Sequence, residues 1–380
     1  MKRKLLISLL IFMVMIPMLS QTVMAADTQS ILQEQTQKSG ASDLYQKAPE
    51  SAKSSLSQLG IKTPDSASLA RFTPANLFRL VCSQAKEAAQ KPIKAVLTIF
   101  GILMLCALLN TMKNTFAEKS LKTVFDVVCG LCIAAAIMVP VSQCITQAAQ
   151  VIEQSSQFML SVLPVFSGLV IASGHPASGA LYQGFLVAVS QVISQIAATT
   201  FVPMISIYLG FCVIGSVSPG IQINSVAKFF KNIVTWGVVL LLTAFTGILT
   251  VQGLISQAAD TVTMKTAKFV VGSVVPVIGS TISDAMNTVV GCANLLKTAT
   301  GAYAIVVFLF MYLPPVINCV LWILAAEISL AFADLLGINN MSGLLNSVKQ
   351  ALQVLIALIL TAALAMIISI SVMLLLGMVN

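Results

Sequence analysis

Apolar stretches separated by short polar segments fill the chain from residue 95 almost to its end. They lie at 95–112, 123–145, 157–174, 181–199, 201–217, 233–254, 269–283, 286–300, 303–333 and 351–378. A membrane-spanning helix needs roughly 20 predominantly apolar residues, and most of these stretches are of that order. The pattern predicts an all-α fold, a polytopic transmembrane helical bundle with about ten crossings, or about eight if the proline-containing stretches re-enter the membrane.

The first 92 residues follow a different pattern. A basic segment (2–4) precedes an apolar run (5–18), and residues 23–25 offer small side chains for cleavage. This arrangement predicts a signal peptide over residues 1–25, with a retained N-terminal anchor as the alternative. Residues 26–92 are rich in Ser, Gln, Lys and Ala, so we expect a small extracytoplasmic region of loosely packed polar and amphipathic helices.

One helix in this region is predicted in detail. Thr73 can cap its N-terminus, and Pro74 suits the first helical position. Apolar residues then recur at helical spacing from Leu77, while Arg79 and Lys86 mark a polar face. Two partners stay open for the apolar face: the membrane surface or another protein, and the membrane part of the same chain.

The membrane part repeats its own sequence. Residues 145–149 (ITQAA) return at 255–259 (ISQAA), 110 positions later, and residues 161–165 (SVLPV) return at 273–277 (SVVPV), 112 positions later. Lysine pairs open both copies, at 119 and 122 and at 228 and 231. The membrane domain, 93–380, is therefore expected to hold repeats at about 119–227 and 228–348 and a final helix at 349–380, an arrangement that many transporters and pores use.

Proline recurs at matching points of the two copies. Pro164 and Pro276 occupy one matched pair, and Pro203 corresponds to the Pro314-Pro315 dipeptide. Proline removes a backbone donor and clashes with the preceding turn, so these residues predict kinked or broken helices. Broken backbone at membrane depth is tolerated where it is buried in protein or lines water, which favours a central path. The alternative is that the prolines only shape helix packing.

Composition and charge agree with a membrane protein. The chain is 57% hydrophobic and 9% charged, against about 25% charged in ordinary soluble domains. The net charge of +8 comes from scattered Lys and Arg without an aromatic-basic stripe, so no nucleic acid partner is expected. The positive-inside rule places the 113–122 loop, Lys228, Lys231 and Lys349 in the cytoplasm, although other lysines favour the opposite side.

Charged residues within apolar stretches are the main candidates for function, because each must be paired or hydrated there. Glu327 is the strongest, and Asp334 follows two turns later. Glu327 is either a path residue that binds a cation or relays protons, or a member of a structural ion pair.

Motifs for catalysis are not visible in the sequence. The single histidine, His175, lies in a turn-rich segment without a nearby acid or cysteine. No phosphate-binding loop, paired-histidine zinc motif or nucleophile elbow occurs, so we expect no enzyme, cofactor or metal site. Cys129 and Cys132 have a redox spacing but lie in an apolar stretch, where packing is the better interpretation, and the eight cysteines predict no disulfide framework.

Taken together, these features resemble the stage III sporulation protein AE family of endospore-forming Firmicutes. The resemblance rests on residues 119–126 (KSLKTVFD), the proline phrases 161–165 and 273–277, and residues 312–318 (YLPPVIN). It implies a multi-pass protein of the mother-cell membrane around the forespore, in a channel or secretion-like complex required for forespore development. The implied partners are other stage III sporulation A proteins, including a separate ATPase and ring-forming subunits, and stage II sporulation protein Q.

We therefore expect a membrane subunit, or export-gate-like core, of such a complex. Small residues in the apolar stretches are compatible with a homo-oligomer. The alternative is a stand-alone secondary transporter of a small solute or ion with Glu327 at its coupling site.

Overall fold

The computed structural model describes residues 36–37, 39–64, 66–113, 119–217, 224–274 and 279–375. This part of the chain is helical and contains no strand. Four short elements come first: η2 (Ala41–Asp43), α3 (Leu44–Lys47), α4 (Glu50–Gln58) and α5 (Ser66–Leu69). The others are α6 (Pro74–Ala88), α7 (Gln90–Lys113), α8 (Lys119–Ala172), α9 (Pro176–Ile196), the π-helix η3 (Ala197–Phe201), α10 (Val202–Val217), α11 (Asn224–Val274), α12 (Gly279–Leu335) and α13 (Asn339–Leu375).

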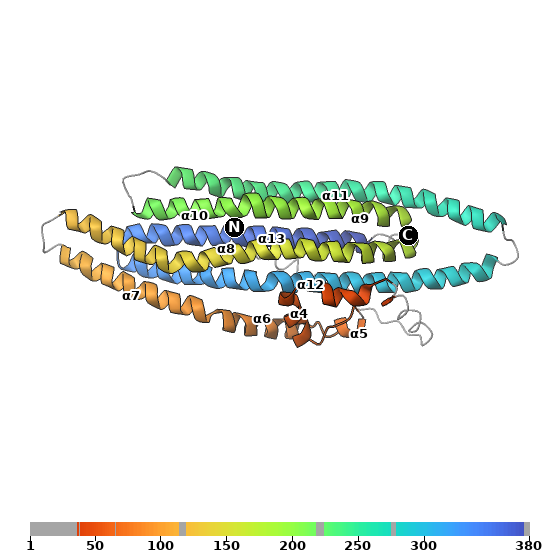
Figure 1. The fold of residues 1–380 in the computed structure, drawn as a ribbon, viewed down its shortest axis with the longest axis horizontal. Coiled ribbons are helices and arrows are strands. Elements are labelled where there is room, and N and C mark those ends of the chain that lie inside the picture. Colours follow the sequence, from red (N-terminus) through yellow and green to blue (C-terminus); the bar gives the residue numbers. More distant parts are fainter. Residues whose placement is uncertain are drawn as a thin grey trace.

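The long helices lie side by side along one axis and form an elongated bundle (Figure 1). With 57 residues, α12 is roughly 85 Å long at 1.5 Å per residue, well beyond the hydrocarbon thickness of a bilayer. Helix α13 packs against α8, α9, α10, α11 and α12 and fills the middle of the bundle. Helix α11 lies on one side of the molecule, and α4, α6 and α7 lie on the opposite side (Figure 1).

Six helical stretches of the described chain are long and apolar enough to cross a membrane. They are Pro74–Leu108, Val127–Ala172, Pro176–Gly215, Ser225–Gln252, Val290–Leu335 and Met341–Leu375. Eight to ten crossings were predicted, and the described residues hold six helices that could each make one. Hydropathy falls in the polar segment between 145 and 157, but that segment continues as helix α8 because its Ser, Thr and Gln side chains bond to nearby carbonyls or to other helices.

Three of the prolines predicted to kink or break their helices do not break them. Pro164 lies inside α8, and Pro314 and Pro315 lie inside α12, without interruption of either helix. Proline removes one backbone donor, but packed neighbours and local hydrogen bonds can hold a long helix together across that point. Pro276 lies outside the described residues, so its effect on the backbone stays a prediction.

Pro203 lies where the backbone changes its pitch. The π-helix η3 ends at Phe201, and Pro203 is the second residue of α10. A proline ring clashes with the carbonyl four residues earlier, which here belongs to Thr199 in η3, and the wider π-turn relieves this clash. At this position the backbone is altered, as expected, although the helix continues.

Two glycines make the sharp turns between antiparallel helices. Gly174 after α8 and Gly337 after α12 have φ values of 92° and 69°, a region that L-residues rarely adopt. In each turn the residue after the glycine donates its N–H to a carbonyl five residues earlier, His175 to Val170 and Ile338 to Ala333. Both turns are Schellman motifs, which end one helix and allow the next to begin at once.

The predicted helix at Thr73 is confirmed. The Thr73 side chain accepts a hydrogen bond from the Asn76 N–H, and Pro74 opens α6. Leu80 is buried while Arg79 and Lys86 are exposed, and α6 packs against α12 of the same chain. Of the two partners left open for the apolar face, the chain's own membrane part is the one observed.

The short helices before α6 are packed more tightly than predicted. Leu44, Ala52, Leu56 and Ile61 are fully buried. Helix α3 packs against α8 and α4 packs against α12, so the apolar residues of these short helices are buried on the surface of the bundle.

Candidate functional site

Glu327, the strongest candidate from the sequence, forms an ion pair. Its Oε2 atom lies 2.8 Å from Nζ of Lys349, which joins α12 to α13. The Glu327 side chain is 57% exposed and that of Lys349 is 18% exposed, so the pair lies on the outer side of the helix junction. Of the two interpretations of Glu327, the ion pair is the one that the geometry displays.

Hydrogen bonds beside this pair tie in two more helices. Lys231 of α11 donates from Nζ to Oε1 of Gln350, the residue after Lys349, over 2.8 Å. The Tyr208 hydroxyl of α10 donates to the Ser347 carbonyl over 3.3 Å. We define the junction cluster as Tyr208, Lys231, Glu327, Lys349 and Gln350. It cross-links α10, α11, α12 and α13 at one depth of the bundle.

Asp334 belongs to a different contact. Its Oδ1 atom accepts a hydrogen bond from the Ser342 hydroxyl across the α12–α13 turn. Asp334 is exposed near the end of α12, and its partner is in the first turns of α13. Glu327 and Asp334 therefore stabilise the same helix pair at two heights, through separate partners.

The prolines proposed as path residues are not brought together. Pro164 and Pro203 are exposed on the outer surface, Pro314 is half-buried and Pro315 is buried. Pro276 lies outside the described residues. The middle of the bundle is occupied by α13, whose Leu345, Leu355 and Ile359 are fully buried.

Polar contacts on either side of Pro314-Pro315 were not predicted from the sequence. The Tyr312 hydroxyl lies 2.6 Å from Oγ of Ser155, and both groups are buried. Asn318 donates from Nδ2 to Oε1 of Gln147 over 2.8 Å. These two bonds hold α12 to α8 above and below the prolines, where α12 lacks backbone donors. Polar residues flanking a proline pair in an apolar helix are the signal that could have identified them.

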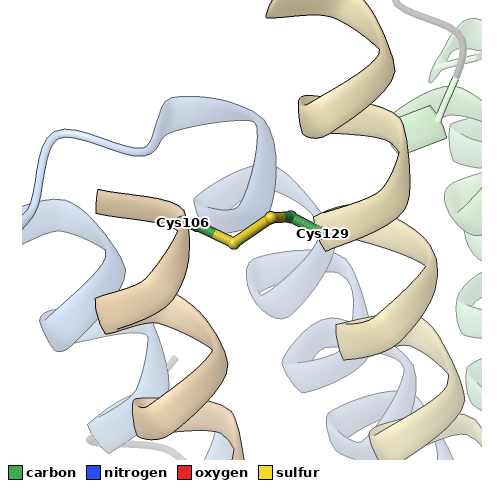
Figure 2. The surroundings of a disulfide bond; sticks show 2 residues. All are labelled: Cys106 and Cys129. Atoms are coloured by element: carbon green, nitrogen blue, oxygen red, sulfur yellow. A yellow bond between two sulfur atoms is a disulfide. The ribbon is translucent and has the colours of Figure 1, made fainter. Parts of the chain in front are cut away.

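A disulfide that was not predicted joins two helices. Cys106 of α7 and Cys129 of α8 form this bond, with their Cα atoms 6.3 Å apart (Figure 2). The packing interpretation of Cys129 is therefore corrected. Cys129 pairs with Cys106 on the neighbouring helix and not with Cys132, which is free.

Two further features are a buried lysine and a surface groove. Lys297 of α12 is fully buried inside the bundle. A groove of about 480 Å³ lies between the α3–α4 segment and α8, lined by Lys47, Glu50, Gln154 and Gln157 among others.

In the described part of the chain, no three His, Cys, Asp or Glu residues are grouped as a metal site would require. The polar side chains described above join helices to one another through ion pairs and hydrogen bonds.

Comparison with known proteins gives a family. The model of the stage III sporulation protein AE family matches residues 66–377. The stage III sporulation protein AE of Bacillus subtilis (strain 168) is 23% identical over 273 residues, which are 71% of this chain and 66% of that relative. The match thus spans slightly under two thirds of the relative's length. No solved structure matches the chain. The family match covers all six of the helices that could span a membrane, and the chain belongs to the stage III sporulation protein AE family.

Proposed function

We propose that this chain is a membrane subunit of a channel or secretion-like complex that links the mother cell to the forespore and is required for forespore development. Family membership implies a role in sporulation, and six helices can cross a membrane. The mother-cell membrane around the forespore is the proposed location. Within this proposal, the partners are the other stage III sporulation A proteins, a separate ATPase and ring-forming subunits among them, and stage II sporulation protein Q.

The packed interior is the observation that carries the proposal. Helix α13 is surrounded by five other helices, and its apolar side chains fill the axis on which a transporter would hold its solute. Glu327, the proposed coupling residue of a transporter, lies on the outer side of the helix junction and is paired with Lys349. Both features favour a subunit that works with neighbours over a stand-alone secondary transporter.

The repeated halves and the prolines have a place in this proposal. The two opening helices of the proposed repeats are α8 and α11, of 54 and 51 residues. Because Pro164 and Pro203 are exposed, any path that they border lies between this chain and a neighbouring subunit. The predicted extracytoplasmic region, 26–92, packs through α3, α4 and α6 on α8 and α12, and from this side of the bundle it would meet partners.

Reconstitution separates the two functions. The purified chain in liposomes should not transport small solutes or ions, whereas the chain tagged in sporulating cells should co-purify with other stage III sporulation A proteins. Solute uptake by the chain alone, with no co-purified partners, would favour the transporter. The matched variant is Glu327→Gln, which should change neither result.

A further inference from the structure

The two long sides of the bundle differ in polarity at the same depth. On one side, α11 exposes a mainly apolar surface, in which the exposed polar residues are uncharged: Asn232, Thr235, Thr243 and Thr250. This lipid-side surface consists of Phe229, Ile233, Trp236, Val239, Leu240, Ile248 and Val251, which are 37% to 76% exposed. No charged residue occurs between 232 and 252. Such a stretch covers about 30 Å of helix, the thickness of a bilayer's hydrocarbon core.

On another side of the bundle, α8 exposes polar residues. We define the glutamine stripe as the exposed residues Ser142, Gln143, Thr146, Gln147, Gln150, Glu153, Gln154 and Gln157. Five of the eight are glutamines, and the stripe extends over about four helical turns. Hydrocarbon cannot satisfy these amide and carboxylate groups, so lipid is a poor neighbour for them.

Three side-chain contacts place the two surfaces at one depth. Lys349 joins Glu327, and the adjacent Gln350 joins Lys231, so Glu327 of α12 and Lys231 of α11 lie at the same height. Asn318, nine residues before Glu327, bonds to Gln147 of α8. Helices α11 and α12 run in opposite directions (Figure 1). Leu240, nine residues after Lys231, is therefore expected at the height of Gln147. The neighbouring residues Thr146 and Val239 are matched in the same way.

Full charges lie at this depth on the side away from α11. The rings of Phe72 and Phe310 are 5.9 Å apart, and those of Phe100 and Phe332 are 4.8 Å apart. Helix α6 and the start of α7 therefore run beside the part of α12 that holds Asn318 and Glu327. Their exposed residues in this interval include Arg79, Lys86 and Glu87. A lipid environment would leave these charges unsolvated.

We infer that the glutamine stripe and the polar face of α6 border a water-filled path within the membrane, while α11 faces lipid at the same depth. The inference rests on the proposed function, because the path needs neighbouring subunits as its other wall. Water of the conduit then contacts the glutamine stripe and α6, and lipid acyl chains contact α11. The path then runs along the outside of the helical bundle, past side chains that can hydrogen-bond to water.

Cysteine labelling at two matched positions tests this assignment. Thr146 and Val239 have nearly the same shape and depth but lie on the two different surfaces, so Thr146→Cys and Val239→Cys form a matched pair. Cys82 and Cys132 are the exposed free cysteines, and serine replaces both in the background chain. The variants are expressed in sporulating cells, and opened membranes are treated with a membrane-impermeant thiol reagent, with detergent-solubilised samples as the measure of full reactivity.

The inference predicts that Thr146→Cys reacts in membranes as fast as in detergent, and that Val239→Cys loses labelling until detergent is added. Labelling of both residues in membranes would overturn it, because this depth would then lie outside the bilayer. Protection of Thr146→Cys in membranes would also overturn it, because lipid or protein would then cover the stripe. Restoration of heat-resistant spores by both variants is scored in parallel, so a failure of the sporulation role is seen separately from a failure of the assignment.

Discussion

Lys349 and Glu327 meet at 2.8 Å across the α12–α13 pair, beside the Lys231–Gln350 bond that adds α11. The pair lies where three helices share one depth, and its charges are opposite in sign. Because the Glu327 side chain is 57% exposed, water or lipid headgroups can reach it, and such pairs contribute about 0–1 kcal/mol in water. Its role is to hold the register of helices, with a modest share of the stability.

Charge exchange tests that role. We expect Glu327→Gln to leave spore formation near the parental level, since an amide still accepts a hydrogen bond from Lys349. Lys349→Glu places two carboxylates together and should lower the amount of protein in the membrane, as measured by immunoblot. The exchange Glu327→Lys with Lys349→Glu should restore it. Loss of spores in Glu327→Gln, with normal protein levels, would instead support a path residue.

The buried bond between Tyr312 and Ser155 predicts a stability change. Tyr312→Phe removes this bond, while the Ser155 hydroxyl keeps its bond to the Ile152 carbonyl, so the change should cost about 0.5–1.5 kcal/mol and lower Tm in detergent. Tyr303→Phe is the matched control. Tyr303 is also buried, but its hydroxyl makes no hydrogen bond to the described residues, so its removal should be nearly neutral. Equal losses in the two variants would contradict the assignment.

Close packing at Gly301 predicts a second stability change. A Cβ atom there would lie 2.6 Å from Cδ2 of Leu374 and 2.9 Å from Cε2 of Phe166. Gly301→Ala should therefore destabilise the chain by about 1–3 kcal/mol, despite the better helix propensity of alanine. Gly291→Ala on the same helix has open space around the new methyl group and should stabilise by about 0.5–1 kcal/mol. Thermal unfolding in detergent compares the two, and a stabilising Gly301→Ala would refute the packing.

The bond between Cys106 and Cys129 predicts a thiol count. The denatured chain should alkylate at six cysteines without reductant and at eight after reduction, measured by intact mass. Cys106→Ser should free Cys129 and give seven reactive thiols without reductant. Cys132→Ser, a control at a free cysteine, should give five. Eight reactive thiols in the parental chain without reductant would show that this bond is not formed.

Local signals in the sequence predicted local structure well. Thr73 and Pro74 were sufficient to locate the start of α6, because a cap depends on neighbours within three residues. The division of residues 123–174 into two spans was wrong for the opposite reason, since Lys119–Ala172 form the single helix α8. Whether the polar segment within α8 is a loop or a helix depends on Tyr312 and Asn318, which contact it from more than 150 residues away.

The sequence left the candidate site open where a residue's partner is distant in the chain. Glu327 stood out because a charge in an apolar stretch is conspicuous, but its pairing with Lys349 depends on the turn at Gly337 that folds α13 back on α12. Helical periodicity cannot show that Pro164 faces outward, since either side of α8 could face the bundle. Cys106 and Cys129 likewise come together only when α7 and α8 pack as a hairpin.

Deletion of the gene in a spore-forming host is the most direct test of the proposed function. The strain should grow normally, complete engulfment and then fail to express late forespore genes or to form heat-resistant spores. Reintroduction of the parental chain or of Glu327→Gln should restore both readouts. Normal numbers of heat-resistant spores in the deletion strain would contradict the proposed role in sporulation and favour the stand-alone transporter.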